Sequence, residues 1–121
     1  MAVDASTLKH FYPLDSLRPE TLDAVAREAD AEEYTRGQSL FKAGDADEVT
    51  YYLLKGQVLG EYPDGKTKVQ AADSLQGRYA IGDLQPRRFT ASVTSATATV
   101  ITIDRRFLEK VITLDQLTRT S

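Results

Sequence analysis

The residues best suited to chemistry lie in one segment, residues 77–93, which carries three arginines and one aspartate. The arginines are Arg78, Arg87 and Arg88, and the aspartate is Asp83. Arginine stays charged at physiological pH and donates paired hydrogen bonds to phosphate, so this composition predicts a site for a small anion. Ion pairs inside the fold or on its surface are the alternative use of the same arginines.

Three more features of the segment bear on the chemistry of that site. Tyr79 and Phe89 can stack on a base, although an aromatic side chain beside strands also suits a hydrophobic core. Asp83 either accepts a hydrogen bond from a sugar hydroxyl or caps a turn, and we favour the turn.

Composition argues against several classes of catalytic site. The chain has 121 residues, no cysteine and a single histidine, His10, so it offers neither a thiol nucleophile nor a cluster of metal-binding histidines. The sequence shows no pairing of a nucleophile with a base. We therefore expect a protein that is not an enzyme and that needs no metal or cofactor.

Charge is spread unevenly along the chain. Residues 1–48 carry 5 basic and 11 acidic side chains, whereas residues 49–121 carry 10 basic and 7 acidic ones. The acidic half would repel phosphate, which argues against direct binding to nucleic acid, and the basic excess of the second half suits a local anion site. Because no apolar run approaches the ~20 residues that span a bilayer, we expect a cytoplasmic domain with no membrane segment.

The elements that must position residues 77–93 are mostly short strands. Apolar residues at helical spacing predict helices over residues 7–12 and 19–29, and a last helix that Asp104 can cap. Between them, glycine and proline turns separate stretches rich in β-branched and aromatic residues. The predicted strands cover residues 33–35, 38–41, 49–55, 57–62, 67–72, 89–95 and 97–103.

This order predicts a mainly β fold with flanking helices. We expect an antiparallel β-roll of the jelly-roll kind with about seven or eight short strands. The N-terminal helices and a C-terminal helix would pack on one side of it. Residues 1–121 would form a single domain, with residues 1–6 as a flexible lead-in.

Three stretches carry an ordered pattern of glycines, aromatic residues and aliphatic residues: residues 34–45, 51–58 and 98–107. The glycines are Gly37, Gly44 and Gly56, and they suit the sharp corners of a β-roll, where positive φ angles occur. In this order and spacing, residues 14–112 resemble the cyclic-nucleotide-binding domain family, which includes catabolite activator proteins and regulatory subunits of protein kinase A. The resemblance implies a β-roll that binds a cyclic phosphate through backbone N–H groups and one arginine.

The ligand segment departs from the pattern of that family. Family members read Phe-Gly-Glu-x-Ala-Leu and, after several residues, Pro-Arg-Ala-Ala/Ser-x-Val, with the glutamate on the ribose 2′-hydroxyl. If Pro86 and Arg87 match the family's Pro-Arg pair, Gly77 and Ala80 match its glycine and alanine. Arg78 then stands in place of the glutamate.

Two further alignments each break a different part of the motif. Placing residues 81–84 on Phe-Gly-Glu-Leu keeps the acidic Asp83 but leaves three residues before Arg87, too few for the turn around the phosphate. Residues 90–93 match the end of the motif, and that count puts Phe89 at the arginine position. The candidate binding residues are Gly77, Arg78, Tyr79, Ala80, Asp83, Arg87, Arg88, Thr90 and Ala91.

The resemblance implies a regulatory or sensor domain with altered or lost affinity for cyclic nucleotides, controlling an effector outside this chain. Its ligand would be a small anion, such as a cyclic mononucleotide, or a cyclic dinucleotide whose two phosphates suit the additional arginines. The alternative is a domain of the same fold that binds no ligand and contacts other proteins. The effector would lie beyond Ser121 or in a partner protein, and the domain is compatible with a homodimer.

Overall fold

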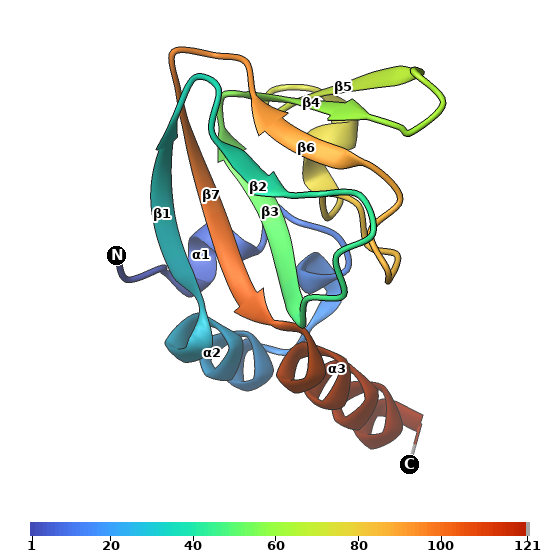
Figure 1. The fold of residues 1–121 in the computed structure, drawn as a ribbon. Helices are drawn as coiled ribbons and strands as arrows, with labels where there is room; N and C mark the ends of the chain where they lie inside the picture. The colour runs from blue at the N-terminus through green and yellow to red at the C-terminus, as the bar shows by residue number, and fades with distance from the viewer. Residues whose placement is uncertain (121) are drawn as a thin grey trace.

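The computed structural model describes residues 1–120, with side chains as far as residue 118, and its seven strands form two antiparallel sheets. Strands β1 (Asp30–Thr35), β7 (Thr97–Asp104) and β3 (Val49–Lys55) form the first sheet in that order. The second sheet has the order β2 (Ser39–Phe41), β6 (Thr90–Val93), β4 (Gln57–Glu61) and β5 (Thr67–Ala71). The strands run from the first sheet into the second and enclose the interior of a roll (Figure 1). The predicted antiparallel β-roll is confirmed.

The first sheet separates two hydrophobic cores because its side chains alternate between its faces. Tyr52 and Ile101 pair in register and belong to the core between the first sheet and the helices. Their neighbours Leu53 and Val100 also pair, and they belong to the core inside the roll. The central strands are therefore buried on both faces, which explains their dense apolar sequence.

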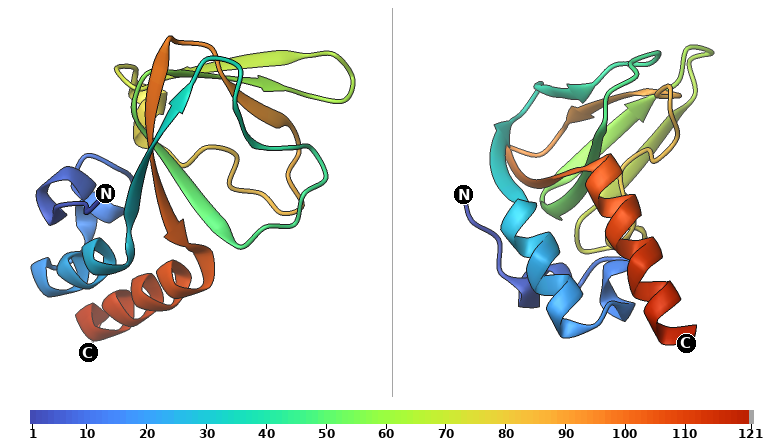
Figure 2. Two further views of the ribbon diagram at one scale, coloured as in Figure 1. Left: turned by 60° about the vertical axis from the view of Figure 1, so that its left-hand side comes forward. Right: turned by 90° about the horizontal axis from the view of Figure 1, so that it is seen from below.

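The helices gather against the outer face of the first sheet (Figure 2). They are α1 (Ala5–Leu8), α2 (Pro19–Glu28) and α3 (Arg105–Thr120), with the short 3₁₀ helix η1 (Leu14–Ser16). A second 3₁₀ helix, η2 (Leu75–Arg78), lies beside β3 and β5. Asp115 of α3 is buried and accepts hydrogen bonds from Thr21 Oγ1 at 2.7 Å and Arg18 Nε at 3.0 Å. This carboxylate fixes α3 to the start of α2. Among the residues described, no helix has both the length and the apolarity that crossing a membrane requires.

Local sequence signals located the later elements more accurately than the first ones. Helix α2 ends one residue before its predicted end, and Asp104 caps α3 by accepting a hydrogen bond from the Phe107 N–H at 2.9 Å. The helix expected over residues 7–12 instead covers Ala5–Leu8. Residues 1–6, for which the sequence predicts a flexible lead-in, include the start of α1, and the Met1 amino group donates to Asp30 Oδ1 at 2.7 Å.

Candidate functional site

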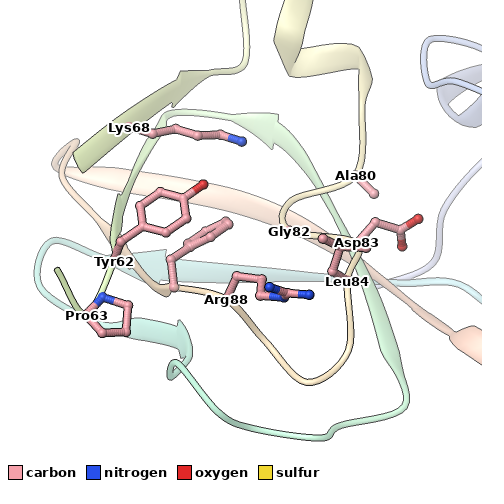
Figure 3. A pocket seen from close by; sticks show the side chains of 9 residues that line it. Tyr62, Pro63, Lys68, Ala80, Gly82, Asp83, Leu84 and Arg88 are labelled. Atoms are coloured by element: carbon pink, nitrogen blue, oxygen red, sulfur yellow. The ribbon is translucent and has the colours of Figure 1, made fainter. Parts of the chain in front are cut away.

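A cavity of about 560 Å³ lies between the β4–β5 hairpin and the loop that joins η2 to β6 (Figure 3). The hairpin contributes Tyr62, Pro63 and Lys68. The loop contributes Ala80, Gly82, Asp83, Leu84, Arg88 and Phe89. The volume of the cavity falls in the range of small-molecule sites, about 300–1,000 Å³. A second cavity of about 630 Å³, at the β3–β4 turn, contains none of the residues that the sequence nominated.

The sequence-based site is only partly assembled around this cavity. Of the nominated residues, Ala80, Asp83 and Arg88 line it. The other nominated residues lie outside the lining: Gly77, Arg78, Tyr79, Arg87, Thr90 and Ala91. For each of these six, the structure shows a contact within the protein.

The Arg87 side chain is buried and forms hydrogen bonds inside the fold. The residue is 3% exposed, and its Nε donates a hydrogen bond to Asp47 Oδ2 at 3.0 Å. The same guanidinium donates to the backbone carbonyls of Val49, Ile81 and Gly82. Its Cζ lies 4.2 Å from the centre of the Phe41 ring. The guanidinium thus joins the loop to the start of β3, so its described donors already have partners within the protein.

Arg78 and Gly77 also have structural partners. The Arg78 guanidinium forms an ion pair with Asp15 at 3.1 Å and donates to the His10 carbonyl at 3.0 Å. A Cβ on Gly77 would lie 2.5 Å from the carbonyl oxygen of Ala71, so η2 can pack there only with glycine. These contacts favour the ion-pair interpretation for Arg78 and a fold role for Gly77.

The remaining nominated residues belong to the surface or the core. Tyr79 packs its ring against Tyr12, with the ring centres 5.3 Å apart. The Thr90 hydroxyl accepts a hydrogen bond from the Ala43 N–H at 3.0 Å, and Ala91 is fully buried inside the roll. None of the three presents a group to the 560 Å³ cavity.

Two cations at the cavity differ from the arginines described above. Within residues 1–118, neither Arg88 nor Lys68 forms an ion pair or a side-chain hydrogen bond. The Lys68 ammonium lies 5.5 Å from the centre of the Phe89 ring. Sequence reasoning missed Lys68 because it lies on the hairpin, about ten residues before the segment, and only the closure of the roll brings it there.

Phe89 forms the apolar floor of the cavity. Its buried ring lies 5.5 Å from the centre of Phe41 and 5.2 Å from that of Tyr62. Gly60 and Gly82 leave the space that the ring fills, since a Cβ on either would lie 2.7–2.8 Å from it. An aromatic side chain thus stands where one alignment places the phosphate-binding arginine of the family.

Asp83 connects the cavity rim to the last helix. Its side chain is exposed, and the Arg105 guanidinium donates to its carbonyl oxygen at 2.7 Å and lies 3.7 Å from its carboxylate. Arg105 is the first residue of α3. The aspartate therefore joins the loop to α3, a contact that neither sequence interpretation included.

The ion pair between Arg87 and Asp47 should make the stability of the protein depend on pH in the acidic range. The hydrogen bond from Arg87 holds the pKa of Asp47 below its usual value of about 3.9. Below about pH 5 the unfolded chain therefore takes up more protons at this group than the folded one, so this stabilisation falls as the pH falls. We expect Asp47→Asn to lower the free energy of urea unfolding more at pH 7 than at pH 3. Equal losses at the two pH values would contradict this assignment.

Comparisons with known proteins identify the fold. No family model matches the chain, and no curated protein sequence matches it. Among solved structures, the regulatory domain of Toxoplasma gondii protein kinase A with cAMP is 19% identical, with a TM-score of 0.75 over 96% of this chain and 47% of that one. The regulatory subunit of a cAMP-independent protein kinase A from Trypanosoma cruzi, bound to guanosine, is 17% identical, with a TM-score of 0.75 over 88% of this chain and 38% of that one.

A third similar structure is the sensor domain of the transcriptional regulator DNR from Pseudomonas aeruginosa. It is 18% identical, with a TM-score of 0.72 over 96% of this chain and 89% of that one. The chain thus has the fold of the cyclic-nucleotide-binding domains of regulatory proteins. It spans less than half the length of the two kinase regulatory chains. The similar structures are regulatory or sensor proteins by their descriptions.

Proposed function

We propose that this chain is a regulatory domain that binds a small anion with a planar ring, of the nucleotide class, and that binds cAMP weakly. The observation that carries the proposal is the pairing of two cations, Lys68 and Arg88, with the aromatic side chains Tyr62 and Phe89 around one cavity. Neither cation has an ionic partner among the residues described, so an anionic ligand could bind without displacing an internal ion pair.

Weak binding of cAMP follows from the groups that the cavity lacks. No residue that lines it is a glutamate, and the alternative acceptor Asp83 lies beside Arg105. Phe89 offers no donor to a phosphate, and the Arg87 guanidinium is engaged with Asp47 and carbonyls. Loss of one charge-assisted hydrogen bond costs about 1.5–3 kcal/mol, or one to two decades of affinity.

One comparison supports a ligand other than cAMP. The Trypanosoma cruzi structure is described as cAMP-independent and bound to guanosine, so this fold accommodates a nucleoside without a phosphate.

The hydrogen bond from Arg105 to Asp83 connects the proposed ligand site to α3, through which binding could act on an effector outside this chain. A ligand that moves Asp83 would move the first turn of α3, and this turn should then show changed amide hydrogen exchange.

Calorimetry of the purified chain with cAMP, cGMP, cyclic di-GMP and guanosine tests the proposed function. We expect binding of cGMP or cyclic di-GMP, and a loss of about tenfold in its affinity in Lys68→Met, because an ion pair with the ligand's phosphate is removed. Guanosine carries no phosphate, so Lys68→Met should leave any affinity for it unchanged. Lys66→Met is the matched control, since Lys66 lies on the same hairpin, is exposed and does not line the cavity.

Three outcomes would contradict parts of the proposal. Micromolar binding of cAMP would contradict the weak affinity. Equal effects of Lys68→Met and Lys66→Met would contradict the assigned cavity. No heat with any of the four compounds would instead favour a domain that contacts proteins without a ligand, an interpretation that the internal use of Arg78 and Arg87 already makes worth testing.

A further inference from the structure

A smaller cavity adjoins the candidate site and shares two of its residues. This smaller cavity has a volume of about 310 Å³ and is lined by Lys68, Gln70, Gln76, Tyr79 and Ala80. Lys68 and Ala80 also line the 560 Å³ cavity. In Figure 3 the Lys68 side chain points toward the side on which Ala80 lies. The two cavities are therefore two lobes of one groove, with Lys68 at their boundary.

The second lobe is built by a buried side chain. Gln70 is 6% exposed, and its amide nitrogen donates to the carbonyl oxygens of Gln76 at 3.2 Å and Tyr79 at 3.0 Å. These bonds hold the segment that carries Tyr79 against β5. The lobe consequently exists before any ligand arrives, which lowers the entropy cost of binding.

Both lobes are lined by aromatic side chains, and a positive charge lies at the boundary between them. The first lobe has the rings of Tyr62 and Phe89, and the second has the ring of Tyr79, which is 51% exposed. Aromatic side chains bind the planar face of any base. Lys68 places a cation at the boundary, and Arg88 adds a second in the first lobe.

We propose that the groove binds a dinucleotide, with a linking phosphate at Lys68, one base in the first lobe and the other beside Tyr79. This inference rests on the proposed function, because it assigns the ligand of the same site. A mononucleotide would occupy the first lobe alone and make no contact with Tyr79. The argument does not depend on Arg78 or Arg87, whose guanidinium groups are engaged elsewhere.

Calorimetry with three probes and matched variants tests the dinucleotide. The probes are cyclic di-GMP, its linear form pGpG and the mononucleotide cGMP, so that a cyclic and a linear dinucleotide are distinguished. Tyr79→Ala should weaken the preferred dinucleotide about tenfold and leave cGMP unchanged, since one base loses its stacking partner. Lys68→Met should weaken both classes. Leu75→Ala is the control for Tyr79, because Leu75 is 77% exposed on η2 and lines neither lobe.

The outcomes separate this inference from the proposed function. If cGMP binds but neither dinucleotide binds more tightly, the two-lobed site is overturned and the proposed function stands. If Tyr79→Ala weakens cGMP and the dinucleotide equally, the assignment of the second lobe is overturned. Absence of heat with all three probes and with guanosine would overturn both. Circular dichroism of each variant confirms that a loss of binding is not a loss of fold.

Discussion

Replacement of Arg87 by methionine is expected to lower the free energy of unfolding by about 3–5 kcal/mol, which is the usual effect of removing one partner of a buried ion pair. The guanidinium is almost fully buried and donates to Asp47 and to the carbonyls of Val49, Ile81 and Gly82. Without it, the buried carbonyl of Ile81 and the part-buried acceptors around it lose their donor. A loss of this size is a large part of the 5–15 kcal/mol that stabilises a typical domain.

Urea unfolding measures this loss, and the next residue in the chain provides the control. Arg88→Met removes the same side chain from an exposed position, where the expected change is within about 0.5 kcal/mol. Arg87→Lys should restore only part of the stability, because an ammonium cannot reproduce the planar set of guanidinium bonds. Equal losses in Arg87→Met and Arg88→Met would show that the buried network does not stabilise the fold.

Replacement of Gly56 by alanine is the second change for which we expect a large effect. Gly56 has φ = +97°, and a Cβ would lie 2.7 Å from both Ser95 Oγ and the Thr97 carbonyl oxygen. Ser95 cannot simply move away, because its hydroxyl donates to Thr97 and accepts from the Gln57 N–H. Backbone strain of about 1–2 kcal/mol and overpacking of about 1–3 kcal/mol together predict a loss of about 2–5 kcal/mol.

Gly65→Ala separates the two causes. Gly65 has φ = +91° in the β4–β5 turn, and a Cβ there would have no atom within 4 Å. This variant should lose only the strain of about 1–2 kcal/mol. Chemical denaturation of both variants gives the comparison, and a loss in Gly65→Ala as large as that in Gly56→Ala would mean that crowding at Ser95 adds nothing.

The sequence was sufficient to predict the β-roll, and the reason is local. Residues 49–55 and 97–103 are rich in apolar and β-branched side chains, which allows each strand to bury both faces, and glycines between strands permit the corners. Asp104 and Pro19 gave correct starts for α3 and α2 because capping depends on neighbours in the chain. The first helix was misplaced where a long-range contact intervenes: the Tyr12 N–H donates to the Arg78 carbonyl at 2.7 Å and not within a helix.

The candidate site was less predictable because residue type does not fix side-chain direction. The sequence predicts an anion site in residues 77–93, and of the three arginines in that segment Arg88 lines the cavity. It could not distinguish Arg88 from Arg87, its neighbour, whose side chain enters the interior to meet Asp47.

The sequence by itself thus determined the roll and its corners. Only the tertiary structure decided which cations face the cavity. Lys68 lines it from a separate hairpin, and Arg87 is buried because it binds Asp47. Both events depend on contacts between residues far apart in the chain, which neither periodicity nor turn chemistry encodes.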